Sequence, residues 1–233
     1  MTFHIITIFP KIFDSYFNES ILGRAQKNHI IKIKTYDLRQ WTNDKHKTVD
    51  DTPYGGGAGM VMKIDVLRKA VNYVKSQITN TKSQTNLNNQ KTKVVLLSAK
   101  GKTWNQQMAK KYAKLDDVIF ICGRYEGVDE RIKKFIDEEI SIGDYVLTGG
   151  EIPAMAIIDS LTRLLPNALG NVESAIDESH STPGTLEYPH YTRPEIFEAN
   201  GKKYRVPKIL LSGNHKKIQE WRDKKTKIQK KKV

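Results

Sequence analysis

The feature that most constrains the fold is a regular alternation of strand-like and helix-like segments between residues 93 and 165. Short apolar, β-prone runs are each followed by a segment in which apolar residues recur at helical spacing. We expect strands over residues 93–98, 118–122 and 139–142, and helices over residues 103–114, 128–135 and 151–165. This alternation predicts an α/β protein with a parallel sheet that carries helices on both faces.

Each of these expected strands ends in a glycine-rich stretch. The stretches are Leu96–Gly101, Cys122–Gly127 and Ser141–Ala154. Glycine lets the backbone turn with positive φ and lets a ligand come close to bare N–H groups. Because α/β folds bind ligands beyond the carboxyl ends of parallel strands, the glycine-rich exits together predict one pocket. The alternative interpretation is a set of ordinary turns.

The segments on either side of this region complete the domain organisation. Strands are expected over residues 2–8 and 30–36, helices over residues 11–17, 20–28 and 64–74, and a long loop over residues 37–60. Residues 76–92 are rich in polar side chains and predict a surface excursion. Two further helices are expected over residues 195–200 and 215–230. We therefore expect a cofactor-binding domain over residues 1–165, an interdomain linker over 166–190 and a small, basic helical domain over 191–233.

The positive charge of the chain is concentrated at its C-terminal end. The whole chain has 39 Lys and Arg against 26 Asp and Glu, a net charge of +13. Residues 202–233 hold 13 of the basic residues against Glu220 and Asp223, a net charge of +11, which leaves 26 basic and 24 acidic residues elsewhere. A basic end of this kind predicts a polyanionic partner, nucleic acid first and an anionic membrane second. A solvated lysine tail is the alternative for residues 230–233.

Cysteine content and hydropathy predict a soluble, cytoplasmic protein. The single cysteine, Cys122, excludes an internal disulfide and fits a reducing compartment. No apolar run approaches the ~20 residues that a membrane-spanning helix needs. The N-terminal residues lack the basic and long apolar regions of a signal peptide. We expect no membrane association.

The motifs that are absent narrow the chemistry. The glycine-rich loop Pro53–Met60 lacks both the Gly-Lys-Ser/Thr of a P-loop and the spacing of a dinucleotide fingerprint, so it is either a flexible connector or a wall that closes on a flat ligand. The chain has no His-Glu-x-x-His, cysteine cluster or Gly-x-Ser-x-Gly, so we expect no dedicated metal site and no serine hydrolase. Residues Tyr188–Pro194 combine aromatic and basic side chains, which suit stacking on unpaired bases or simply anchor the linker.

A series of motifs, in a fixed order, resembles one enzyme family. They are Asp50-Asp51-x-Pro-Tyr-Gly-Gly-Gly-x-Gly-Met, Cys-Gly-Arg-Tyr-Glu-Gly-Val-Asp-Glu-Arg, Ser-Ile-Gly-Asp-Tyr-Val-Leu-Thr-Gly-Gly-Glu, Pro-His-Tyr-Thr-Arg-Pro and Leu-Leu-Ser-Gly-Asn-His. From Thr2 to about Arg222 the chain closely resembles bacterial tRNA (guanine-N1)-methyltransferase, the TrmD family of the SPOUT superfamily. The resemblance implies S-adenosylmethionine as cofactor, assistance by magnesium, a trefoil knot, a homodimer, and methylation of guanine 37 beside the anticodon of tRNA.

The resemblance also implies roles for individual residues. The implied cofactor-binding residues follow the glycine-rich exits and are Leu97, Ser98, Gly101, Gly123, Tyr125, Glu126, Gly127, Ile142, Gly143, Tyr145, Leu147, Gly149, Gly150 and Pro153. The implied substrate-binding residues are Tyr54, Gly59, His190, Arg193, Asn214 and His215. The implied catalytic residues are Arg163 and a carboxylate, Glu178 or Asp177.

Methylation of guanine N1 needs a base because the neutral N1 carries a proton and is a poor nucleophile. Negative charge then builds toward O6, where a fixed arginine, here Arg163, can stabilise it. The resemblance implies the position of the base: counting forward from Ser174-Ala175, Glu178 takes the place of the family's aspartate. Counting back from Pro189 shifts the register by one residue and leaves Asp177 open. Because Ser179 follows Glu178, as a serine follows the base in the family, we favour Glu178.

Two other functions remain open from the sequence. A non-catalytic RNA-binding protein would use the basic end alone and would bind no methyl donor, which the glycine-rich exits argue against. A SPOUT methyltransferase that acts on another RNA is disfavoured only by the resemblance of the Pro-His-Tyr-Thr-Arg-Pro and Gly-Asn-His segments.

Overall fold

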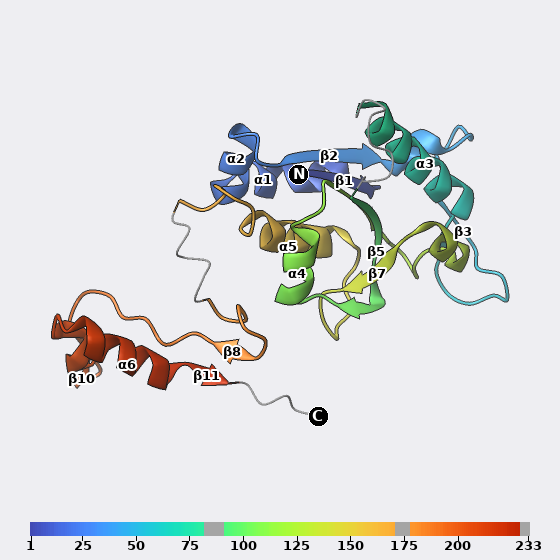
Figure 1. The fold of residues 1–233 in the computed structure, drawn as a ribbon. Coiled ribbons are helices and arrows are strands. Elements are labelled where there is room, and N and C mark those ends of the chain that lie inside the picture. The colour runs from blue at the N-terminus through green and yellow to red at the C-terminus, as the bar shows by residue number, and fades with distance from the viewer. Residues whose placement is uncertain (82–90, 171–177, 229–233) are drawn as a thin grey trace. The chain divides into compact units, whose positions relative to one another are not determined.

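The structure is a computed structural model that describes residues 1–81, 91–170 and 178–228 of the 233-residue chain (Figure 1). The chain divides into two compact units, Met1–Gly170 and Asn171–Val233. Within the described ranges, no helix combines the length and the apolar character that crossing a membrane requires.

A five-stranded parallel sheet forms the centre of the first unit. In spatial order its strands are β2 (Lys32–Asp37), β1 (Thr2–Thr7), β6 (Asp117–Cys122), β5 (Thr92–Thr103) and β7 (Glu138–Ser141). Every residue of β6 is buried, as expected for a central strand that is covered on both faces. The predicted α/β fold with a parallel sheet is confirmed.

The sheet separates two apolar cores. Side chains alternate across β6, so that Phe120 and Cys122 belong to one core and Ile119 and Ile121 to the other. The first core is covered by η1 (Pro10–Phe13), α1 (Asp14–Phe17), α2 (Ser20–Lys27), α4 (Gln106–Tyr112) and α5 (Glu151–Thr162). The second core is covered by η2 (Leu38–Trp41), α3 (Ile64–Thr81) and η4 (Glu130–Phe135). In Figure 1, α3 accordingly lies away from α4 and α5.

Several helices differ from the prediction in type or length. The helix expected over residues 11–17 is the 3-10 helix η1 followed by α1, and the helix expected over residues 128–135 is the 3-10 helix η4. Helix α3 continues to Thr81 because Ile78, one turn after Val74, is also buried. The surface excursion predicted over residues 76–92 therefore does not begin at Ser76, and its residues 82–90 lie outside the described ranges.

Two irregular features shape the edge of the sheet that carries the glycine-rich exits. Leu97 and Lys102 of β5 both pair with Ile140 of β7, so residues 98–101 bulge out of the ladder between them. The short strands β3 (Asp50–Asp51) and β4 (Val61–Met62) pair antiparallel and hold the two ends of the Pro53–Met60 loop together. The first glycine-rich stretch is therefore a bulge within a strand, and not a strand exit.

The second unit is not purely helical, which corrects the prediction. It contains η6 (Lys208–Leu211) and α6 (His215–Lys225), together with the antiparallel pairs β8 (Thr185–Leu186) with β11 (Lys227–Ile228) and β9 (Ile196–Ala199) with β10 (Lys202–Arg205). The predicted helix over residues 195–200 is wrong: β9 and β10 form a hairpin because Asn200 and Gly201, at φ 51° and 71°, make the tight turn between them. The helix predicted over residues 215–230 ends at Lys225.

Candidate functional site

A cavity of about 220 Å³ lies where β5, β6 and β7 meet the start of α5. All the predicted cofactor-binding residues except Gly101 line it: Leu97, Ser98, Gly123, Tyr125, Glu126, Gly127, Ile142, Gly143, Tyr145, Leu147, Gly149, Gly150 and Pro153. Parallel strands bring these segments, far apart in the sequence, to one edge of the sheet. The single pocket that the glycine-rich stretches predict is therefore present in the first unit.

Gly101 serves the sheet and does not line the cavity. A Cβ atom at this position would lie 2.4 Å from the Ile140 backbone nitrogen and 2.5 Å from the Glu139 carbonyl carbon. These atoms belong to the neighbouring strand β7 and cannot move aside easily. Gly101 is therefore needed where the bulge of residues 98–101 closes and β5 pairs again with β7.

The second glycine-rich stretch contacts the Pro53–Met60 loop. The backbone N–H of Glu126 donates a hydrogen bond to the Met60 carbonyl at 3.0 Å. A Cβ atom at Gly59, which has φ 84°, would lie 2.4 Å from Glu126 Cγ. Burial and a hydrogen bond with Asp50 raise the pKa of Tyr125. The end of the loop that contains Gly59 thus lies against a wall of the cavity, whereas Tyr54 is fully exposed at the other end.

The third glycine-rich stretch packs directly against the second. The Gly150 backbone N–H donates to the Gly123 carbonyl at 2.9 Å. A Cβ atom at Gly150 would lie 2.7 Å from Cys122 Cα and 3.0 Å from the Gly123 nitrogen. Burial of Cys122 beneath these loops raises the pKa of its thiol well above the ordinary value. The absence of a side chain at Gly150 therefore sets the spacing between the two loops.

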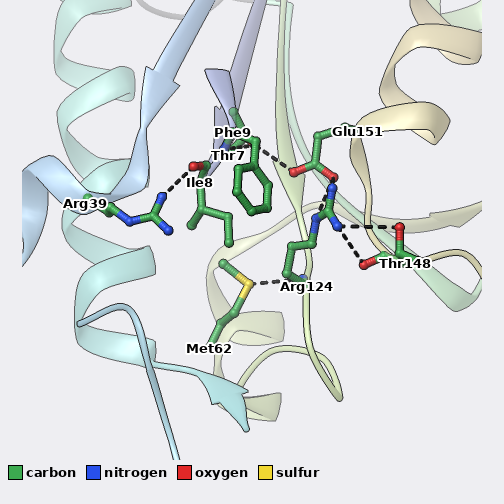
Figure 2. Close-up of polar contacts among 8 residues, drawn as sticks. All are labelled: Thr7, Ile8, Phe9, Arg39, Met62, Arg124, Thr148 and Glu151. Atoms are coloured by element: carbon green, nitrogen blue, oxygen red, sulfur yellow. Dashed lines mark hydrogen bonds and ion pairs between the residues drawn. The ribbon is translucent and has the colours of Figure 1, made fainter. Parts of the chain in front are cut away.

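A buried ion pair joins the same two loops (Figure 2). Arg124 donates to Glu151 Oε2 through Nε at 2.9 Å, and its Nη2 lies at 2.9 Å from the same oxygen. Arg124 Nη1 donates to the Thr148 carbonyl at 3.2 Å. The other carboxylate oxygen of Glu151 accepts from Thr7 Oγ1 at 2.7 Å. The sequence did not predict this pair, because nothing in it indicates which of the 24 acidic residues within residues 1–201 an arginine will contact.

A second charged cluster lies on the cavity wall and was also missed. Lys133 Nζ is 2.6 Å from Glu130 Oε1 and 3.0 Å from Glu139 Oε2, and all three residues line the cavity. The hydrogen bonds to Glu130 and Glu139 raise the pKa of Lys133. The carboxylates of Glu130 and Glu139 are thus both paired with Lys133.

Arg163, the predicted catalytic arginine, is not part of the cavity lining. It is the C-terminal cap residue of α5, whose first turn lies at the cavity through Pro153. At 1.5 Å per residue, the 12 residues of α5 span about 18 Å. Within one chain, Arg163 and the cavity therefore lie at opposite ends of this helix.

The remaining predicted residues belong to the second unit. The Glu178 carbonyl accepts from the Ser181 N–H at 3.0 Å, and Asp177 lies outside the described residues. His190 Nε2 lies 2.8 Å from Glu187 Oε1. Asn214 caps α6 by accepting from the Lys217 N–H at 3.1 Å, and His215 begins this helix. Arg193 is exposed in the segment before β9.

This unit also gathers aromatic and cationic side chains. The Arg222 guanidinium lies 4.9 Å from the ring centre of Tyr188, and the rings of Tyr191 and Trp221 are 6.4 Å apart. Tyr191 remains half exposed. The unit therefore presents side chains of the kinds that stack on unpaired bases.

The described ranges contain no cluster of side chains that could bind a metal ion. Residues 1–81, 91–170 and 178–228 contain no group of three or more His, Cys, Asp or Glu side chains placed to hold a metal ion. The cavity acids Glu130 and Glu139 contact Lys133 instead.

The fold and the cavity define a class of protein: an α/β protein with a parallel sheet and a cavity between glycine-rich segments at one end of its strands. The family model described as "tRNA (Guanine-1)-methyltransferase TrmD" matches residues 1–233. The chain therefore belongs to the TrmD family.

Similar proteins cover nearly the whole chain. It is 51% identical over 220 residues to the tRNA (guanine-N(1)-)-methyltransferase of Dictyoglomus turgidum, which is 94% of this chain and 82% of that protein. The protein of the same name from Clostridioides difficile is 51% identical over 223 residues, 95% of this chain and 90% of its own length. That of Clostridium botulinum (strain Hall) is 49% identical over 228 residues, 98% and 88% of the two chains.

Proposed function

We propose that this protein is an enzyme that transfers a methyl group from S-adenosylmethionine to N1 of guanine 37 in tRNA. The observation that carries the proposal is the cavity of about 220 Å³ formed by the glycine-rich stretches, in a chain that belongs to the TrmD family. Relatives about half identical along nearly the full length carry the name tRNA (guanine-N(1)-)-methyltransferase.

The residues that line the cavity fit the proposed cofactor. Leu97, Ile142 and Leu147 offer an apolar surface to an adenine ring, and Gly123 and Gly149 line the cavity without adding side chains. Glu126 adds a carboxylate that suits ribose hydroxyls or a cationic group. When bound there, S-adenosylmethionine supplies a methyl group on a positively charged sulfur. Among the described residues, no group of three or more His, Cys, Asp or Glu side chains offers magnesium a dedicated protein site.

The protein's part in the reaction is to remove a proton and to stabilise charge. We assign Glu178 as the base that accepts the proton of guanine N1, with Asp177 as the alternative. We assign Arg163 to guanine O6, where negative charge develops as the proton leaves. The loops of the cavity contribute by fixing the position of the methyl donor relative to N1.

The position of Arg163 supports a homodimer. Because α5 separates Arg163 from the cavity of its own chain by about 18 Å, we propose that Arg163 acts at the cavity of a second copy. The exposed aromatic and aliphatic side chains Phe9, Ile12 and Tyr16, on the side of the unit that α5 also occupies, supply an apolar surface for such contact. Tyr16 also donates to Asp159 of α5 at 2.7 Å.

The proposal extends to the knot and to the domains. The chain after β7 returns past β5 to the end of β6, where Arg124 and Gly149 form a bridge. This return path supports the trefoil knot that the family implies. We propose residues 166–190 as the linker and residues 191–233 as the part that binds tRNA, with Tyr54, Gly59, His190, Arg193, Asn214 and His215 facing the substrate. Because its proposed substrate is tRNA, we place the enzyme in the cytoplasm.

The test is to map the methyl group on its product. An unmodified tRNA transcript with guanine at position 37 is incubated with the protein and with S-adenosylmethionine labelled in the methyl group. The expected result is one methyl per tRNA, on N1 of guanine 37, located by nuclease digestion and by a stop in primer extension. Methylation of another nucleotide would identify a methyltransferase for a different site. RNA binding without any methyl transfer would favour a non-catalytic RNA-binding protein.

A further inference from the structure

The proposed chemistry leaves Arg124 and Glu151 without a role, although Arg124 lines the cavity and Glu151 contacts it from the buried side. Glu151 is only 1% exposed, on the first turn of α5. Burying a carboxylate is costly unless it is paired and hydrogen-bonded. Both of its oxygens are satisfied, Oε1 by the Thr7 hydroxyl and Oε2 by the Arg124 guanidinium. The fold thus maintains a buried charge at this position through contacts to two other segments.

All three nitrogens of the Arg124 guanidinium have partners (Figure 2). Nε and Nη2 face Glu151, and Nη1 faces the carbonyl of Thr148 at 3.2 Å and its hydroxyl at 3.4 Å. The guanidinium carbon also lies 4.8 Å from the centre of the Phe9 ring. The Arg124 backbone N–H donates to Met62 Sδ at 3.2 Å. Because Glu151 neutralises its charge and uses its fork, Arg124 is poorly suited to bind a substrate anion.

The neighbouring glycine fits this arrangement. A Cβ atom at Gly149 would lie 2.2 Å from Arg124 Nε and 2.6 Å from Glu151 Oε2. The ion pair therefore occupies the space that any side chain at Gly149 would need. Thr148, Gly149 and Gly150 all line the cavity, so the guanidinium sets the position of cavity backbone that it touches directly.

We propose that Arg124 and Glu151 are positioning residues for the methyl-donor site. Glu151, anchored to the end of β1 through Thr7, orients the guanidinium, and the guanidinium fixes the Thr148–Gly150 backbone against the Gly123–Gly127 loop. The inference rests on the proposed function, because it assigns the cavity to S-adenosylmethionine. Its consequence is that the pair controls affinity for the cofactor more than the rate of the chemical step.

The first variant is Arg124→Lys, which keeps the positive charge next to Glu151 but loses the fork that also reaches Thr148. We expect the KM for S-adenosylmethionine and the Kd for S-adenosylhomocysteine to rise about tenfold, while kcat at saturating cofactor stays within about threefold of the wild type. A raised KM with unchanged kcat indicates that the variant has lost an interaction that stabilises the ground state and the transition state equally. The matched control is Arg68→Lys, since Arg68 stacks on Phe135 at 3.7 Å and does not line the cavity. The control should leave KM, Kd and kcat unchanged.

The second variant is Glu151→Gln, which keeps the shape of the side chain and removes its charge. We expect KM to rise in this variant too, and the double variant Arg124→Lys/Glu151→Gln to raise KM by less than the product of the two single effects, because both act through one contact. Thermal unfolding of every variant is measured in parallel. A melting temperature that falls in Arg124→Lys while KM and Kd stay at the wild-type values would make the pair purely structural and overturn the proposal. A fall in kcat with unchanged KM would overturn it as well.

The two readouts keep this inference separate from the proposed function. If the wild-type protein binds S-adenosylhomocysteine but methylates no guanine, the proposed function fails, and the Kd values of the variants still decide the role of the pair. If the wild-type protein binds no S-adenosylhomocysteine, the cavity is not a methyl-donor site and this inference fails directly.

Discussion

Replacing Gly150 with alanine places a methyl group between two loops of the cavity. The new Cβ would lie 2.7 Å from Cys122 Cα and 3.0 Å from the Gly123 nitrogen, both of which are backbone atoms. Carbon atoms pack best at about 3.5–4.0 Å, so the loops must separate by roughly 1 Å. The hydrogen bond from the Gly150 N–H to the Gly123 carbonyl, now 2.9 Å, would lengthen to about 3.9 Å and be lost.

The loss of stability and of cofactor affinity in Gly150→Ala can be estimated from these contacts. Overpacking costs about 1–3 kcal/mol, and a lost hydrogen bond costs about 0.5–1.5 kcal/mol. We expect the free energy of unfolding to fall by about 1.5–4.5 kcal/mol, the combined cost of the two effects. We also expect the Kd for S-adenosylhomocysteine to rise about 10- to 100-fold, equivalent to about 1.4–2.8 kcal/mol. Chemical denaturation measures the first quantity, and isothermal titration calorimetry at a temperature where the variant is folded measures the second.

The control is Gly170→Ala. A Cβ atom at Gly170 meets nothing within 4 Å, and this glycine does not line the cavity. Both the stability and the affinity of this variant should equal those of the wild type. If Gly150→Ala bound S-adenosylhomocysteine as tightly as Gly170→Ala does, the spacing of the two loops would not govern the site and the reasoning would be refuted.

The remaining predictions concern the base, the basic end and the buried thiol. Glu178→Gln should slow single-turnover methyl transfer at least ~100-fold with unchanged cofactor affinity, whereas Asp177→Asn should slow it much less. If Asp177→Asn is instead the variant with the large loss of rate, the base is Asp177. Truncation after Ile228 removes three of the lysines and should reduce the slope of log K for tRNA binding against log salt concentration by about two to three, with no change in cofactor affinity. An unaltered slope would mean that these lysines contact no phosphate. Because burial raises the pKa of the Cys122 thiol well above its ordinary value of 9.0, the contribution of this thiol to stability is present below pH 9.0 and is lost as the pH rises further. Native protein at pH 8 should therefore resist thiol reagents that label the unfolded chain, and rapid labelling of the native protein would contradict the burial of this residue.

The sheet and the location of the cavity could be predicted because their signals are local. Apolar β-prone runs followed by helical periodicity specify parallel strands, and glycines after such runs indicate loops at one edge of the sheet. The Asn200-Gly201 pair was also a local signal, for a hairpin, and the prediction of a helix at this point overlooked it.

Other features depend on contacts that sequence spacing does not reveal. The bulge at residues 98–101 follows from the pairing of both Leu97 and Lys102 with Ile140, about 40 residues further along the chain. The link between Arg124, Glu151 and Thr7 joins three segments that only the folded sheet brings together. Gly101 and Gly150 both lie in glycine-rich stretches, and the sequence does not distinguish their roles. Gly101 is required by the pairing of β5 with β7, whereas Gly150 is required by the spacing of the cavity loops.

The most direct test of the central claim is a crystal structure of the protein with S-adenosylhomocysteine bound. The account predicts that the ligand lies in the cavity between the bulge of residues 98–101, the Gly123–Gly127 loop and the Ser141–Gly150 segment, with the Arg124–Glu151 pair intact behind it. Ligand density at another place on the chain, with this cavity empty, would contradict the account.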